Sequence, residues 1–333
     1  MMNKSLFAVL ISGIVITSSS FAAETKPLRI GWVYALANAP ALIAEQQGFY
    51  QQEGLDVELK SFGDGPVISQ ALAAHELDAA YIGAPPVFQW YSRGLKGQII
   101  AKVNSGQAAL IVPAASAITQ LSDLKGKTIA GVKKGSGMDV LLRGLILEQE
   151  AKLVADKEVQ VVSMPAGNMP AALRQGVVDA AFTWEPFISE SVLRGDARIL
   201  LDASKVQPGY PWYVLMAQPE TLANRPEDTV KLLRAHQKAV DFINQHPAEA
   251  NQIIANAFKL QAIKTADGKT ILPEEVVNEA RQRIGWSVTL TDADKAFIGR
   301  LMQDSQQLGY MQQAPDINDV VDTQWLKKAG ISE

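Results

Sequence analysis

The chain of 333 residues contains no cysteine. This absence excludes disulfide bonds, thiolate metal sites, thiol nucleophiles and a cysteine-linked lipid anchor. A strong charge of one sign is also lacking, because 31 basic and 35 acidic residues leave a net charge of −4. Such a balance gives no support for nucleic-acid binding through phosphate neutralisation. Hydrophobic residues make up 47% and charged residues 20%, which is typical of a folded protein, and the length predicts about two domains.

The first 22 residues have the pattern of a signal peptide. Lys4 supplies a positive charge, and Leu6 to Ile16 form an apolar core that is too short to span a bilayer. Ser20-Phe21-Ala22 fits the small-x-small cleavage rule, so we expect cleavage after Ala22. A buried N-terminal helix is the alternative. Because no later stretch is long and apolar enough to span a membrane, we expect an exported chain that is soluble and not lipidated.

Strands and helices alternate along the first two thirds of the mature chain. Alternating or short apolar runs predict strands at 28–33, 55–59, 78–82, 127–132, 159–163 and 179–183. Between these strands lie segments whose apolar residues recur with the period of a helix. Alternation of this kind predicts an α/β fold in which mostly parallel sheets are flanked by crossover helices.

The pattern of the first half recurs in the second. Six identities fall at an offset of 101 residues: Ala71, Leu72, Asp78, Ala79, Ala80 and Pro85 match Ala172, Leu173, Asp179, Ala180, Ala181 and Pro186. Chance matching in an alanine-rich chain is the alternative, but the shared order of elements favours two similar lobes. From Pro219 onward the spacing is helical, and Thr291 to Asp294 predict a capping box. We therefore predict lobe 1 at 23–112 plus 218–333, with the C-terminal helices, and lobe 2 at 113–217.

Ligands of open parallel sheets bind at the carboxyl ends of the strands. That rule selects six loops, at 34–38, 63–66, 83–86, 133–138, 166–169 and 184–186. In the fourth loop, Ser136 and Asp139 form a capping box, and the free N–H groups of a helix start favour an anion. The alternative is that Ser136 only caps its helix.

Aromatic residues provide further candidates. Trp184 follows a predicted strand and is a candidate wall of the cleft, while Glu185 is a candidate acceptor for the ligand or for the opposite lobe. The alternative is that Trp184 packs in the core and Glu185 caps a helix. Trp212 and Tyr213 precede the helical section and either line the cleft or pack in the core. Gly83-Ala84-Pro85-Pro86 forms a rigid strand-end turn.

Several other classes of site lack their motifs. Gly135-Ser136-Gly137 has no third glycine for a dinucleotide fingerprint, and no P-loop or G-x-S-x-G elbow occurs. The three histidines have no metal-binding spacing. We therefore expect no metal, no cofactor and no catalytic residue, although a carboxylate pair is not excluded by sequence.

The segment Gly48 to Leu59, with the sequence GFYQQEGLDVEL, resembles periplasmic solute-binding proteins for sulfonates, taurine and nitrate. Asp123 to Ala130, Gly135-Ser136 and Asp179 to Phe187 continue the match in order. The resemblance implies a two-lobed periplasmic binding fold (type II) that delivers a solute to a permease and ATPase of an ABC importer. Gly83 to Pro86 and Trp212-Tyr213 look most like alkanesulfonate-binding members, in which the matching loops hold the oxyanion.

The resemblance therefore implies a monomeric, periplasmic binder of a small aliphatic sulfonate, with nucleic acid excluded as a partner. The candidate ligand-binding residues are Tyr34, Ala84, Pro85, Gly135, Ser136, Gly137, Met138, Trp184, Glu185, Trp212 and Tyr213. Taurine binders place acidic residues near positions that match Ala108 and Trp212, which speaks against taurine; taurine, nitrate and other small solutes remain alternatives. A pyrimidine-forming enzyme on the related fold is disfavoured, because it carries a cysteine-rich motif and works inside cells.

Overall fold

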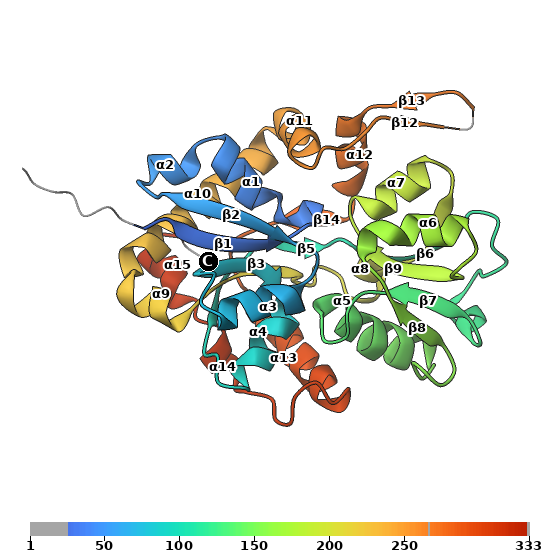
Figure 1. Ribbon diagram of the computed structural model, residues 1–333, viewed down its shortest axis with the longest axis horizontal. Coiled ribbons are helices and arrows are strands. Elements are labelled where there is room, and N and C mark those ends of the chain that lie inside the picture. Colours follow the sequence, from blue (N-terminus) through green and yellow to red (C-terminus); the bar gives the residue numbers. More distant parts are fainter. Residues whose placement is uncertain (1–25, 266, 332–333) are drawn as a thin grey trace, which may run out of the picture.

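Two five-stranded sheets, each flanked by helices, form two lobes that lie side by side (Figure 1). A computed structural model describes residues 26–265 and 267–331. The predicted signal peptide, residues 1–22, lies outside the described residues. Within the described ranges, no helix combines the length and the apolar character that a membrane span requires.

The first sheet has the strand order β2-β1-β3-β11-β4. Its strands are β1 (Leu28–Val33), β2 (Val57–Phe62), β3 (Ala79–Gly83), β4 (Gln98–Lys102) and β11 (Tyr213–Ala217). β1 pairs in parallel with β2 and β3, whereas β11 runs antiparallel to β3 and β4. β3 and β11 are buried along their whole length, as expected for central strands that helices cover on both faces.

The second sheet repeats this arrangement with the order β10-β6-β9-β7-β8. Its strands are β6 (Ala108–Pro113), β7 (Thr128–Gly131), β8 (Gln160–Ser163), β9 (Ala180–Trp184) and β10 (Ala197–Asp202). β7 is parallel to β8 and β9, and β6 is antiparallel to β9 and β10. Both sheets thus have one reversed strand among five, which confirms two lobes with mostly parallel sheets.

The sequence repeat has a structural cause. Asp78 precedes β3, and its carboxylate accepts a 2.8 Å hydrogen bond from the backbone N–H of Arg29 in β1. Asp179 precedes β9 and accepts a 2.8 Å bond from the backbone N–H of Thr128 in β7. The two aspartates therefore tie equivalent strands together in the two lobes, and their match at an offset of 101 residues reflects the same role.

Two short connections link the lobes and run next to each other. Ser105 bridges to Pro211 in an antiparallel pair, and the Tyr210 hydroxyl accepts a 3.0 Å bond from the N–H of Ala108. Sheet membership changes near residues 107 and 212, whereas the predicted lobe limits were 112 and 217. The difference arises because β6 and β11 each complete the sheet of the opposite half, which strand–helix alternation does not reveal.

The helices of the two lobes begin at the loops that follow the strands. In lobe 1 they are η1 (Leu36–Asn38), α1 (Ala39–Gln46), α2 (Phe49–Gln52), α3 (Gly65–Ala73) and α4 (Ala84–Tyr91). In lobe 2 they are η2 (Leu121–Leu124), α5 (Gly137–Val140), the π-helical η3 (Leu141–Ala151), η4 (Ala166–Asn168), α6 (Met169–Arg174), α7 (Phe187–Leu193) and α8 (Ala203–Val206).

The C-terminal section is helical, as predicted, and packs mainly on lobe 1. It contains α9 (Pro219–Asn224), α10 (Pro226–Gln245), α11 (Pro247–Ala257), α12 (Pro273–Ala280), α13 (Asp292–Gln307), α14 (Ile317–Val320) and α15 (Gln324–Lys328). α10 packs on α1 and α2, and α13 packs on α4 and also reaches η3 of lobe 2. The capping box predicted at Thr291 and Asp294 is confirmed at the start of α13.

The same section also contains short strands that its sequence did not predict. β12 (Ile263–Lys264) and β13 (Thr270–Ile271) form a hairpin, and β14 (Ile284–Trp286) pairs with β5 (Asn104–Gly106) next to the connections between the lobes. Segments of two or three residues are too short to show a period, so only pairing in the folded chain identifies them.

Candidate functional site

A small cavity of about 20 Å³ lies between the lobes, at the carboxyl ends of the central strands. We call it the inner cavity. Its lining consists of Val33, Asp64, Gly65, Gly83, Pro86, Val132, Ser136, Gly137, Met138, Trp184, Trp212 and Tyr213. The space holds roughly one water molecule. A larger solute therefore enters only when the lobes separate from this closed arrangement.

A second cavity of about 290 Å³ shares Asp64 and Val132 with the inner cavity. We call it the outer cavity. It is lined by Gly63, Asp64, Val132, Lys133, Ser163, Met164, Pro165 and Ala166, which come from both lobes. The two cavities are adjoining parts of one cleft, with Asp64 on their common wall.

Three helix N-termini contribute to the wall of the inner cavity. Asp64 caps α3 by accepting a 3.0 Å bond from the Val67 N–H, and Ser136 caps α5 by accepting a 3.2 Å bond from the Asp139 N–H. Gly83 stands at the cap position of α4. The N–H groups of a first helical turn have no acceptor inside the helix, and the positive end of the helix dipole lies there. Pro66 in α3 and Pro85 and Pro86 in α4 have no N–H, so the free first-turn donors belong mainly to α5. The inner cavity therefore offers an anion donors chiefly at the start of α5, while its described lining includes no basic side chain and one carboxylate, that of Asp64.

The turn before α4 meets the loop before α5 across the cleft. A Cβ atom added at Gly137 would lie 3.6 Å from Pro85 and from the Trp212 ring, and one at Gly83 would lie 3.7 Å from the Gly137 Cα. These are ordinary van der Waals distances, so the two helix starts are in contact and a Cβ at position 137 would still fit.

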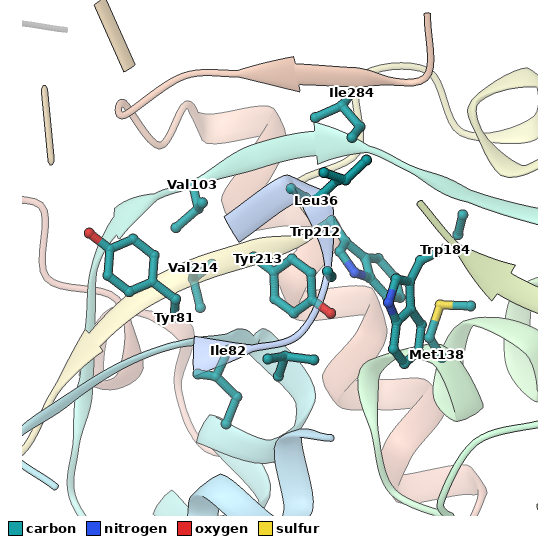
Figure 2. Packing of buried hydrophobic residues seen from close by; sticks show 14 of the residues in the cluster. Leu36, Tyr81, Ile82, Val103, Met138, Trp184, Trp212, Tyr213, Val214 and Ile284 are labelled. Atoms are coloured by element: carbon teal, nitrogen blue, oxygen red, sulfur yellow. The ribbon is translucent and has the colours of Figure 1, made fainter. Parts of the chain in front are cut away.

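Aromatic side chains and a methionine also line the inner cavity. Figure 2 shows Trp184, Trp212 and Met138 grouped together, with the Tyr213 hydroxyl directed toward the two indoles. The Trp212 side chain is 4% exposed, and its Nε1 has no hydrogen-bond partner among the described residues. Burial raises the pKa of the Tyr213 hydroxyl, which therefore stays protonated. A buried donor without a partner is costly, so Trp212 is the strongest candidate to donate to a solute.

Polar contacts join the lobes around this wall. The Trp184 Nε1 donates to the Tyr34 carbonyl at 3.0 Å, and the Leu36 N–H donates to the Glu185 carbonyl at 3.0 Å. The Glu185 carboxylate forms a fully buried ion pair with Arg283, at 2.6 Å, and burial raises its pKa against the opposing charge of that guanidinium. On the other side of the cleft, the Tyr310 hydroxyl donates to the Asp139 carboxylate.

Six of the eleven candidate residues line the inner cavity: Ser136, Gly137, Met138, Trp184, Trp212 and Tyr213. Their contact with a solute stays a prediction. Ala84 and Pro85 lie directly between two lining residues without lining the cavity themselves.

The other three candidates have partners elsewhere. The Tyr34 hydroxyl donates to the Phe258 carbonyl at 2.8 Å, and Gly135 lies against the Gln89 side chain. Of the roles that the sequence suggested for Glu185, the structure shows two: its carboxylate contacts the opposite lobe through Arg283, and it accepts a 3.0 Å bond from the Ser189 N–H near the start of α7.

Sequence reasoning missed six lining residues, namely Val33, Asp64, Gly65, Gly83, Pro86 and Val132. The strand-end rule had selected the loops 63–66 and 83–86, which hold four of these six residues, so a signal for the starts of α3 and α4 was present. What was lacking was a reason to choose between Asp64 as a simple helix cap and Asp64 as part of the cleft wall.

A larger groove of about 860 Å³ lies away from the cleft and is lined by residues such as Lys26, Arg29 and Arg225. It is at the amino end of β1, opposite to the edge where ligands of such sheets bind. Arg29 and Arg225 already pair with Asp78 and Asp228, each at 2.8 Å. The cleft between the lobes is therefore the stronger candidate for the functional site.

Two similar α/β lobes, two neighbouring connections and a cleft at the strand ends define a two-lobed periplasmic-binding-protein fold of type II. The chain belongs to the NMT1-like family, whose model matches residues 21–258.

Individual relatives agree with this assignment. The chain is 28% identical to a putative aliphatic sulfonates-binding protein of Bacillus subtilis, over 92% of this chain and 89% of the relative. Its fold matches the ligand-binding component of an ABC-type import system from Staphylococcus aureus, solved with zinc bound. The TM-score is 0.77 and the sequence identity 16%, and the match covers 92% of this chain and 100% of the other. It also matches the periplasmic aliphatic sulphonate binding protein SsuA of Escherichia coli, with a TM-score of 0.72 and 19% identity; this match covers 89% of this chain and 91% of the other.

Proposed function

We propose that this protein is the solute-binding component of an ABC importer and that its solute is a small aliphatic sulfonate. The observation that carries the proposal is the wall of the inner cavity, where helix starts at Gly83 and Ser136 and the unpartnered Trp212 Nε1 surround one space. The backbone N–H groups of Gly137 and Met138 belong to the first turn of α5, so they add donors for an oxyanion. The sulfonate-binding relatives support the same ligand class.

Binding would proceed by closure of the two lobes. A solute that contacts Ser136 of lobe 2 and Tyr213 of lobe 1, with Trp212 in the connection between them, favours the closed arrangement by its differential affinity for it. The permease and ATPase would then recognise the closed form. The protein would act as a monomer in the periplasm, without a lipid anchor or a cofactor, and without catalysing a reaction.

Isothermal titration calorimetry tests the ligand class. The purified protein would be titrated with propane-1-sulfonate, taurine, sulfate, nitrate and a neutral analogue such as 1-propanol. We expect heat of binding with at least one sulfonate and none with the alcohol. Binding of the neutral solute alone, or of none of these solutes, would overturn the sulfonate proposal; binding of nitrate alone would replace the sulfonate by an inorganic anion.

A further inference from the structure

Two hydrogen bonds join the end of α13 to lobe 2, away from the cavities. Tyr310 follows α13, and its hydroxyl donates to the carboxylate of Asp139 in α5. Asp304, near the end of α13, accepts a 3.1 Å bond from the side chain of Gln149 in η3. We call this pair of hydrogen bonds the closing contact. None of its four residues lines the inner or the outer cavity.

The first side of the closing contact is fixed to lobe 1. The Tyr310 N–H donates to the Ser305 carbonyl of α13 at 2.8 Å, and the Tyr310 carbonyl accepts a 3.2 Å bond from Arg93, which follows α4. α13 in turn packs on α4. Burial and the hydrogen bond to Asp139 raise the pKa of the Tyr310 hydroxyl, which therefore stays protonated and remains a donor. Tyr310 thus moves with lobe 1, while its hydrogen bond ends on lobe 2.

On the side of lobe 2, Asp139 connects this hydrogen bond to the loop before α5. Its carboxylate also accepts a 3.0 Å bond from the Gly135 N–H and a 2.6 Å bond from Arg143 Nε. A capping box would use the Ser136 N–H instead, so Asp139 fixes the loop one residue further back, where Gly135 has φ +81°. Asp139 is only 2% exposed. Because a buried carboxylate is costly to leave short of donors, the loop is held best when Tyr310 is in place.

The second hydrogen bond depends on close packing at Gly144 of η3. A Cβ atom added at Gly144 would lie 2.9 Å from Asp304 Oδ2 and 3.0 Å from Asp304 Cβ. Glycine inside a helix is less stable than alanine, so this position has a cost in the isolated helix. The close approach of α13 accounts for it, since a methyl group here would push α13 away from η3.

We propose that Tyr310 is a positioning residue for solute binding, which holds lobe 1 against lobe 2 and, through Asp139, keeps the loop before α5 in its binding shape. Opening of the lobes breaks the closing contact, because each of its hydrogen bonds runs from one lobe to the other. A contact that exists in only one of two states shifts the population toward that state. The inference rests on the proposed function where it concerns sulfonate affinity, and on the two lobes alone where it concerns closure.

Two substitutions weaken the closing contact by different means. Tyr310→Phe removes the donor and keeps the ring, whereas Gly144→Ala places a methyl group against Asp304. Tyr91→Phe and Gly299→Ala are the matched controls. The Tyr91 hydroxyl donates to no group among the described residues, and a Cβ at Gly299, within α13, would meet no atom within 4 Å.

The lack of cysteine makes the distance between the lobes directly measurable. Spin labels would be attached at two introduced cysteines, Gln51→Cys in α2 of lobe 1 and Gln175→Cys after α6 of lobe 2, both at exposed positions. Double electron–electron resonance then reports the distance between the lobes, with and without propane-1-sulfonate. In the unlabelled proteins, stopped-flow tryptophan fluorescence measures the association and dissociation rate constants of the same sulfonate.

We expect Tyr310→Phe to raise the dissociation rate constant by about 10-fold or more, the loss expected for one hydrogen bond to a charged group. The association rate constant should change by less than about threefold, because the closing contact forms after the solute has entered. Gly144→Ala should act in the same direction. Both variants should show a larger fraction of long lobe distances than the wild type at the same sulfonate concentration, and both controls should match the wild type.

A role in stability alone would lower the unfolding temperature of Tyr310→Phe and leave its lobe distances unchanged, and this result would overturn the proposal. Unchanged dissociation in both variants would overturn it as well. If propane-1-sulfonate does not bind the wild type, the proposed sulfonate ligand fails, and the lobe distances of the solute-free proteins decide the inference. It then fails if Tyr310→Phe and the wild type have the same distribution of lobe distances.

Discussion

Removal of Arg283 should expose how strongly the buried ion pair with Glu185 joins the lobes. The two side chains are 2.6 Å apart, with 7% of the Arg283 side chain and none of the Glu185 side chain exposed. Arg283 comes from the segment before β14, which pairs with β5, whereas Glu185 follows β9 of lobe 2. The substitution Arg283→Met would leave the Glu185 carboxylate buried without its counterion.

The expected loss follows from the burial of both groups. Breaking a buried pair by removing one partner costs about 3–5 kcal/mol, because an uncompensated charge remains. Glu185 retains one bond from the Ser189 N–H at 3.0 Å, which favours the lower part of that range. The double variant Glu185→Gln with Arg283→Met carries no buried charge, so it should recover most of the lost stability.

The effect should also depend on pH. Burial already raises the pKa of Glu185 in the wild type, and removal of the guanidinium should raise it further. An acid with a raised pKa in the folded state contributes least stability above that pKa. The loss in Arg283→Met should therefore be largest at alkaline pH and should shrink as the pH falls toward the unfolded value of about 4.3.

Urea denaturation, followed by tryptophan fluorescence and circular dichroism between pH 5 and 8, measures these free energies of unfolding. Arg174→Met is the matched control, since Arg174 pairs with Asp196 at 3.3 Å and its side chain is 45% exposed. That surface pair should contribute about 0–1 kcal/mol. The reasoning is refuted if Arg283→Met loses no more than this control at pH 8, or if the double variant is no more stable than Arg283→Met.

Three further changes test other parts of the structure. Ser136→Asp keeps the cap of α5 but adds a negative charge to the inner cavity, so the variant should fold, and binding calorimetry should show no heat of sulfonate binding. Ser136→Asn should retain most of the sulfonate affinity. Gly106 has φ +77°, and Gly106→Ala would place a Cβ 2.3 Å from the Arg283 carbonyl oxygen. The midpoint temperature of its thermal unfolding should therefore fall well below that of Gly54→Ala, where φ is +71° but no atom lies within 4 Å of the added Cβ. Equal decreases in the two variants would show that the contact at Gly106 is easily relieved. Burial lowers the pKa of His236 to about 4, so between pH 6.5 and pH 4 its imidazole takes up a proton in the unfolded chain but stays neutral in the folded one, and the wild type should lose up to about 3 kcal/mol of stability. His236→Gln should lack this part of the pH dependence, and His75→Gln, at an exposed site, should keep it; a slope shared by all three proteins would contradict the assignment.

Much of the fold was predictable from local patterns. All six predicted strands are present, and Ser136 and Thr291 cap their helices as their motifs indicated. The crossover strands β6 and β11 were not assigned, because a short apolar run without a period does not specify its partner strands. The cleft could be placed at the strand ends by rule, but five of the eleven candidate residues do not line its inner cavity.

The sequence by itself determined the chemistry that is excluded and the elements that form. The lack of cysteine excludes thiol chemistry, apolar spacing predicts the strands, and capping residues mark the helix starts, since each of these signals depends only on a residue and its near neighbours. Only the tertiary structure decided which of those residues meet. Arg283 pairs with Glu185 across 98 positions of the chain, and Asp64 stands where two cavities adjoin. Contacts of this kind depend on how the two lobes pack, and the spacing of neighbouring residues does not specify which distant segments come into contact.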